Sequence, residues 1–138
     1  MQKASLDDPS YRNGTWGPAY LIQGPSSDMG VLLLDPGDSM PNHIHRHCDE
    51  SFVVLEGACT LWVDGVERHI MTPHEVFRCT PGEMHYLVNE TDERFRCLFI
   101  KSPASPGRHH QHPLGTRGAS PRPDVGLRAA REKEQYRG

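Results

Sequence analysis

The stretch of sequence that decides the fold is residues 36–57, PGDSMPNHIHRHCDESFVVLEG. His43 and His45 lie two residues apart, a spacing that puts two side chains on the same face of a β-strand but on different faces of a helix. Pro41 disfavours a helix further. Two imidazoles on one strand face can converge on a point inside a barrel, and Glu50, which follows a short turn, can place a carboxylate beside them.

A fourth ligand is expected from a strand that is distant in sequence, because a barrel brings such strands together. The candidate is His85, in the stretch 81–89, PGEMHYLVN. Three imidazoles and one carboxylate suit a divalent transition metal (Fe, Mn, Ni, Zn, Co or Cu) better than Ca or Mg, which prefer oxygen ligands. Such a set also leaves coordination positions open, as catalytic metal sites require.

Two other interpretations of these residues stay open at this stage. The histidines could be surface residues near a turn, with Glu50 a solvated charge, or a barrel could keep all four residues without binding a metal.

Short apolar runs separated by turn residues extend outward from this stretch on both sides. The Asp64-Gly65 pair is the sharpest turn signal, because a two-residue type I′ turn needs positive φ at both central positions. Eight or so short strands with such turns indicate an all-β sandwich or barrel. The expected strands are residues 20–22, 31–34, 51–55, 59–63, 66–71, 75–79, 85–88 and 95–100.

The first stretch resembles the cupin motif G(X)5HXH(X)3-4E(X)6G. It matches the motif at every fixed position, which are Gly37, His43, His45, Glu50 and Gly57. The resemblance implies a single small cupin barrel of the jelly-roll type that holds one metal ion through His43, His45, Glu50 and His85.

The second cupin motif, G(X)5PXG(X)2H(X)3N, is matched in part, at Gly82, His85 and Asn89. His74 stands where the first glycine is expected, and Pro81 directly precedes Gly82. This departure is expected to alter the shape of a turn and to leave the ligand position intact.

The chain of 138 residues has the size of one domain. We expect an N-terminal arm at 1–18, the barrel at 19–102 and a mobile, basic tail rich in Pro, Gly and His at 103–138. Residues 1–102 carry 8 Lys and Arg against 15 Asp and Glu, a balance of −7, whereas residues 103–138 carry 7 against 3, a balance of +4. The acidic body argues against nucleic acid as a partner. The resemblance to small cupins implies a homodimer.

The N-terminus lacks the charged start and apolar run of a signal peptide, and no apolar run is long enough to cross a bilayer. We therefore expect a cytoplasmic protein with no membrane partner. Cysteines stand at positions 48, 59, 79 and 97 and form no CxxC pair. They are expected to be reduced residues in or beside strands.

Three further residues are candidates for a place near the metal or the substrate. His47 shares parity with the two motif histidines and could join or replace Glu50, but the turn is expected to break that parity. It is therefore interpreted as a supporting or substrate-facing residue, with a plain turn residue as the alternative. Strand alternation places Phe52 on the face of Glu50, and Asn89 on the face of His85.

The last strand offers a further test of what lines the barrel. Arg94 and Arg96 alternate with Phe95, Cys97 and Phe99, and we expect the apolar set to face inward. An inward arginine would instead indicate a carboxylate or phosphate on the substrate.

The cupin fold carries many chemistries, so the fold alone cannot name the reaction. The resemblance implies a metalloenzyme acting on a small oxygen-rich metabolite, in which the metal acts as a Lewis acid and Glu50 is the catalytic proton shuttle. Dioxygenase or decarboxylase chemistry ranks first. The alternatives are a metal-dependent lyase or isomerase of a sugar acid or carboxylate, and a non-catalytic metabolite-binding protein.

Overall fold

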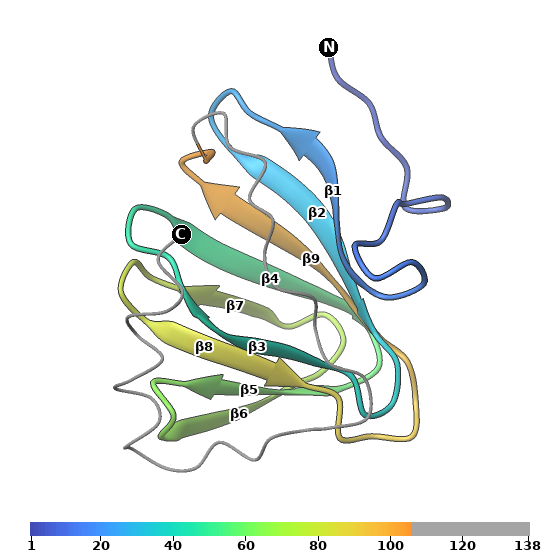
Figure 1. Ribbon diagram of the computed structural model, residues 1–138, viewed down its shortest axis with the longest axis vertical. Coiled ribbons are helices and arrows are strands. Elements are labelled where there is room, and N and C mark those ends of the chain that lie inside the picture. Colours follow the sequence, from blue (N-terminus) through green and yellow to red (C-terminus); the bar gives the residue numbers. More distant parts are fainter. Residues whose placement is uncertain (106–138) are drawn as a thin grey trace.

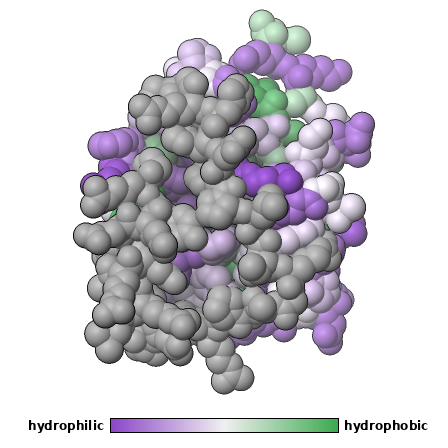
Figure 2. All heavy atoms as spheres, in the orientation of Figure 1, coloured by the Kyte–Doolittle hydropathy of each residue, from purple (hydrophilic) through white to green (hydrophobic). Residues whose placement is uncertain are grey.

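The computed structural model of this protein describes residues 1–105, and these form nine β-strands and no helix (Figure 1). The predicted all-β fold is confirmed. The expected mobile tail falls almost entirely on residues 106–138, outside the described residues. In the view of Figure 2, the described surface is mostly hydrophilic, with hydrophobic side chains gathered in small groups.

The strands form two antiparallel sheets. The five-stranded sheet has the order β1 (Gly17–Gln23), β2 (Asp28–Leu34), β9 (Phe95–Ser102), β4 (Asp49–Glu56), β7 (Val76–Cys79). The four-stranded sheet has the order β3 (Ser39–Ile44), β8 (Met84–Val88), β5 (Cys59–Val63), β6 (Glu67–Met71). The chain crosses between the sheets after β2, β3, β4, β6, β7 and β8, and consecutive strands therefore often belong to opposite layers, as in a jelly roll.

The hydrophobic core lies between the two sheets. Phe95, Cys97 and Phe99 of β9 are buried, as the alternation along this strand predicts, and they pack in one cluster with Phe52 of β4 and Leu61 of β5. Each fully buried large apolar side chain contributes roughly 1.5–3 kcal/mol to folding. The polar residues of the predicted site lie directly beside this core, since the ring centroids of Phe52 and His85 are 5.9 Å apart.

A bulge in β3 sets the direction of the first motif histidine. Met40 pairs with Leu87 and His43 pairs with His85, so β3 advances three residues while β8 advances two. The extra residue lies at Pro41 or Asn42, where proline's missing N–H makes regular pairing impossible. Without this bulge, Met40 and His43 would point to opposite faces of the sheet. With it, both face inward.

The N-terminal arm folds back onto the start of β1. The backbone N–H of Arg12 donates to the Pro18 carbonyl at 2.9 Å, and that of Asn13 donates to the Trp16 carbonyl at 3.2 Å. Trp16 is buried in the core, and β1 begins at Gly17, two residues before the expected start of the barrel. Residues 11–16 thus form part of the barrel wall.

The predicted turn at Asp64 and Gly65 is present with positive φ at both positions, 50° and 72°. The connection differs in length from the expectation, because Val66 also belongs to it: Val63 pairs with Glu67, and the Val66 N–H donates to the Val63 carbonyl at 3.1 Å. Asp64 also ties this hairpin to β8, since its carboxylate accepts a hydrogen bond from the Met84 N–H at 3.0 Å. That bond explains the acidic residue in the turn.

All four cysteines are buried and free of disulfides, in agreement with the prediction. Within the described residues, no helix has the length and apolar character needed to cross a membrane.

Two motif glycines allow a test of backbone packing. Both have positive φ, 84° at Gly37 and 72° at Gly57. A Cβ atom added at Gly37 would meet nothing within 4 Å. A Cβ atom added at Gly57 would collide with the Arg94 carbonyl and lie 3.0 Å from the Phe95 Cα. We predict that Gly37→Ala lowers the free energy of unfolding by about 1–2 kcal/mol, the cost of the left-handed conformation alone. Gly57→Ala adds an overpacking cost and should lose at least about 3 kcal/mol. Urea denaturation would measure both, and equal losses would contradict the steric argument.

Candidate metal centre

Four of the residues predicted from the sequence meet between the two sheets. His43 on β3 is the direct cross-strand partner of His85 on β8, while His45 follows the end of β3 and Glu50 begins β4 in the opposite sheet. One ligand atom of each residue lies within 4.8 Å of the others. We refer to these four residues as the His–Glu cluster. Three of its members are buried, with exposed fractions of 6% at His45, 5% at Glu50 and 1% at His85, and His43 is partly buried.

The imidazoles of the cluster all point at a single oxygen. The Nε2 atoms of His43, His45 and His85 lie 3.2, 2.9 and 2.7 Å from Oε2 of Glu50. Two donor atoms that share one ion at about 2.1 Å lie roughly 3 Å apart in neighbouring positions. The distances between the nitrogens and Oε2 therefore match those between neighbouring ligands of one metal ion.

The other ring nitrogen of two histidines settles which atom faces the carboxylate. Nδ1 of His43 lies 2.9 Å from the Pro41 carbonyl, and Nδ1 of His85 lies 3.2 Å from the Glu83 carbonyl. A carbonyl oxygen only accepts, so each Nδ1 carries a proton. This is the arrangement by which backbone carbonyls orient metal-binding imidazoles.

Electrostatics distinguish the two histidines of the β3–β8 pair. Burial and the neighbouring His85 lower the pKa of His43 to about 4, so His43 is neutral at physiological pH and its Nε2 holds a lone pair. Burial alone would also lower the pKa of His85, but its interactions with Cys79 and Glu50 raise it to about 10. Burial would raise the pKa of Glu50, yet its close contacts with the three imidazoles and the positive charge of Lys101 hold that pKa well below the usual range.

These observations test whether a metal fits the residues present. A neutral His43 with its proton on Nδ1 turns a lone pair toward an ionised carboxylate oxygen, and two acceptors in contact in a buried site repel each other unless a cation lies between them. Three nitrogens and one oxygen are a donor set for a transition metal. The His–Glu cluster therefore fits a divalent transition-metal ion, without indicating which one.

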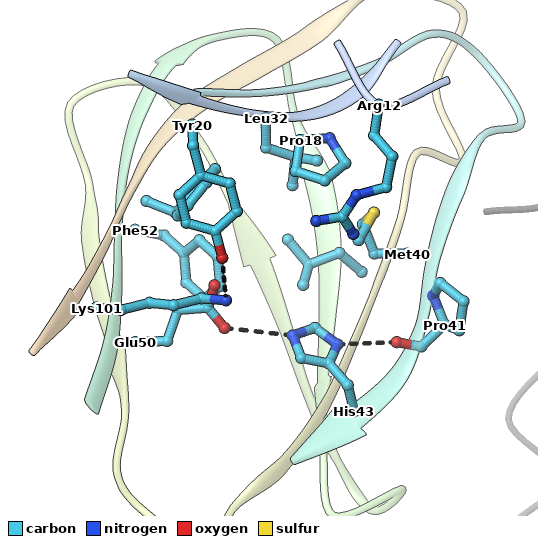
Figure 3. A pocket seen from close by; sticks show the side chains of 12 residues that line it. Arg12, Pro18, Tyr20, Leu32, Met40, Pro41, His43, Glu50, Phe52 and Lys101 are labelled. Atoms are coloured by element: carbon cyan, nitrogen blue, oxygen red, sulfur yellow. Dashed lines mark hydrogen bonds and ion pairs between the residues drawn. The ribbon is translucent and has the colours of Figure 1, made fainter. Parts of the chain in front are cut away.

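A pocket opens from the His–Glu cluster toward the N-terminal arm (Figure 3). Most of its wall is apolar or aromatic, and its polar groups come from the cluster, from Tyr20 and from two cations. The lining residues are Arg12, Pro18, Tyr20, Leu32, Met40, Pro41, His43, Glu50, Phe52, Leu87, Phe99 and Lys101.

The sequence interpretation did not identify Arg12, Tyr20 and Lys101 as site residues. Extending the β9 alternation by one step, from Phe99 to Lys101, would have placed this lysine inside the barrel. The pattern of the sequence holds no comparable signal for Arg12, because a hydrogen bond between the arm and Pro18 brings it to the pocket.

The three candidate supporting residues have different surroundings. Phe52 lines the pocket and its ring centroid lies 5.9 Å from that of His85. His47 is exposed in the turn between β3 and β4 and belongs neither to the pocket lining nor to the His–Glu cluster in the described structure. Asn89 is fully buried, and its amide is used in the scaffold, where Nδ2 donates to the carbonyls of Leu34 and Glu93 at 2.9 and 2.7 Å.

Comparison with known proteins agrees with the architecture. A family model described as "Cupin domain" matches residues 30–101. A Cupin 2 conserved barrel domain protein from Salinispora arenicola superposes with a TM-score of 0.62 at 25% identity, covering 74% of this chain and 88% of that one. A double-stranded β-helix domain protein from Klebsiella pneumoniae gives a TM-score of 0.68 at 19% identity, covering 78% and 94%.

Two relatives carry functional names. The tetracenomycin polyketide synthase protein TcmJ of Streptomyces glaucescens is 29% identical over 126 residues, which cover 86% of this chain and 83% of that protein. Epoxidase atD of Aspergillus terreus is 27% identical over 95 residues, which cover 67% of this chain but 30% of the epoxidase. The chain therefore spans less than a third of the epoxidase.

The geometry of the His–Glu cluster predicts that purified protein carries close to one transition-metal ion per chain. Substituting either His45→Ala or His85→Ala should remove the ion, because each change deletes one of the converging nitrogens. Elemental analysis of protein prepared without a histidine tag measures the occupancy, and circular dichroism confirms that the variants fold. Full occupancy in both variants would contradict the predicted site.

A second pair of variants separates Glu50 from His47. We expect Glu50→Ala to weaken metal binding by about 10-fold or more, since it removes the carboxylate on which the imidazoles converge. The matched control is His47→Ala, which changes an exposed histidine four residues after His43 and two after His45, and it should leave occupancy unchanged. Metal titration of both variants tests this, and the opposite order of effects would assign the ligand to His47.

Proposed function

Because the chain belongs to the cupin family, we propose that it is a metal-dependent enzyme whose His–Glu cluster holds one divalent transition-metal ion, and that it carries out oxygen-using chemistry of the dioxygenase or decarboxylase type. The substrate is a small organic molecule that presents oxygen atoms to the ion. The observation that carries this proposal is the position of the cluster at the base of an open pocket. A purely structural ion would be enclosed by its ligands.

The bound ion would supply Lewis acidity and, where it is redox-active, a route to reaction with dioxygen. The chain's own residues orient the substrate and move its protons. Glu50 is the sole carboxylate among the pocket-lining residues of the described chain, so it is the group that can accept a proton from the substrate. Among residues 1–105 its hydrogen-bonding contacts all involve Oε2, which leaves Oε1 available for that proton.

The apolar wall favours this chemistry over the conversion of a sugar acid. A sugar exposes many hydroxyl groups, and each would need a hydrogen-bond partner once it is buried. Side chains such as Leu32, Phe52 and Phe99 offer none. The name of one relative supports the same choice, since it is called an epoxidase.

The deciding measurement is the dependence of turnover on oxygen. We predict that protein loaded with Fe, Mn or Ni consumes dissolved oxygen with at least one member of a panel of diols, β-diketones and 2-oxo acids. An oxygen electrode together with product analysis by mass spectrometry follows the reaction. The His85→Ala variant is the control for metal released from the protein, and it should show no turnover.

The alternatives give different results in the same experiment. A lyase or isomerase would turn over equally well without oxygen, and Zn or Co would substitute for the redox-active ions because only Lewis acidity is needed. A metabolite-binding protein would show a ligand-dependent rise in melting temperature and no product over hours. Either result would replace oxygen-using chemistry as the function.

A further inference from the structure

We propose that the substrate carries a carboxylate on a largely apolar, ring-bearing body, and that Arg12 binds this carboxylate across the pocket from the Lys101–Tyr20 pair. The inference rests on the proposed function of the His–Glu cluster and adds the charge and shape of the molecule that the pocket accepts. It also makes the N-terminal arm part of the substrate site. Figure 3 shows Arg12 and Lys101 on opposite sides of the same pocket.

Arg12 is held in place as a ligand-binding residue would be. Its backbone N–H is fixed by the Pro18 carbonyl at 2.9 Å, and its half-buried side chain extends into the pocket (Figure 3). Within residues 1–105, the guanidinium has no ion pair and no side-chain hydrogen bond. Burial lowers the pKa of Arg12, because no carboxylate compensates for the loss of water. A planar guanidinium with free donors is suited to binding a carboxylate through two parallel hydrogen bonds.

Lys101 supplies the second cation and is 6% exposed. Its Nζ donates to the Tyr20 hydroxyl at 2.8 Å and lies 5.3 Å from the Tyr20 ring centroid and 5.8 Å from that of Phe99. Because the Tyr20 oxygen accepts this hydrogen bond, its own O–H remains available to donate to an oxygen of the ligand. Lys101 and Tyr20 thus form a positively charged donor pair on the wall opposite Arg12.

The charges of the pocket do not balance without an anionic ligand. Arg12 and Lys101 both line it, and Glu50 is its sole acidic residue among the residues that the structure describes. A divalent ion in the His–Glu cluster would use the charge of Glu50 and add more positive charge. A partly buried guanidinium without a partner is costly, so a neutral substrate would leave Arg12 uncompensated whereas a carboxylate would compensate it.

The other lining residues indicate the polarity of the rest of the ligand. Pro18, Leu32, Met40, Phe52, Leu87 and Phe99 present apolar surface. Tyr20, Phe52 and Phe99 add aromatic rings to this wall, and such rings pack well against a ring of the ligand. A ring-bearing apolar body with one carboxylate therefore matches the polarity of the pocket.

The experiment compares two probes that differ only in charge, a naphthalene carboxylate and its neutral carboxamide. Their affinities are measured by isothermal titration calorimetry against zinc-loaded protein, in which no oxidation of the probe takes place. The variants are Arg12→Gln and the matched control Arg68→Gln, an exposed arginine on β6 that does not line the pocket. Both substitutions remove one positive charge, so the net charge of the protein is the same in the two variants.

Wild-type protein should bind the carboxylate at least about 10-fold more tightly than the carboxamide. Arg12→Gln should weaken carboxylate binding about 10- to 100-fold, the range expected for lost charge-assisted hydrogen bonds, and leave carboxamide binding within about twofold. Arg68→Gln should change neither affinity. Equal affinity of wild-type protein for the two probes, absence of carboxylate binding, or a carboxylate preference retained in Arg12→Gln would each overturn the proposal.

Two further measurements separate this inference from the proposed function. Metal content and oxygen consumption report on the proposed function. Normal values of both, without a carboxylate preference, would overturn the anion site alone. If the protein proves to carry no metal, the same titrations on metal-free protein still test Arg12, because the comparison between Arg12→Gln and Arg68→Gln does not depend on the ion. A contribution from direct contact between the carboxylate and the zinc ion would be common to both variants.

Discussion

The structure depends on one electrostatic constraint, the convergence of three imidazole nitrogens on a single oxygen of Glu50 inside a buried site. The distances of 2.7–3.2 Å bring the lone pair of His43 and the other two imidazoles against an ionised carboxylate, in surroundings from which water is largely excluded. Such a cluster is unfavourable unless a cation occupies it. The backbone carbonyls of Pro41 and Glu83 orient two of the rings for this purpose.

The jelly-roll topology makes this convergence possible because it places ligands from both sheets on facing inner surfaces. The four-stranded sheet contributes the histidine pair on β3 and β8, and the five-stranded sheet contributes Glu50 on β4 and Lys101 on β9. The apolar core is continuous with the wall of the site, because Leu32, Phe52 and Phe99 belong to both. Hydrophobic packing directly beside the site therefore offsets the cost of burying its polar groups.

The pocket connects the cupin fold to a particular kind of ligand. The His–Glu cluster is described by motifs shared across a family of many chemistries, whereas Arg12 lies outside both motifs and outside the residues that the family model matches. A fold can change its substrate by changing the segments that surround a constant centre. In this protein the N-terminal arm and the last strand provide the cations that distinguish its pocket from a purely apolar cleft.

The local pattern of the sequence was sufficient to predict the all-β fold, the inward face of β9 and the residues of the His–Glu cluster. Spacings such as that of His43 and His45, or the alternation of Phe95, Cys97 and Phe99, act within one strand, where the geometry is regular. Other features follow from contacts between distant segments and left no such pattern. Only the tertiary structure revealed the β3 bulge, the use of Asn89 in the scaffold and the position of Arg12. Pairing with β8 decides the first, the carbonyls of Leu34 and Glu93 decide the second, and docking of the arm on Pro18 decides the third.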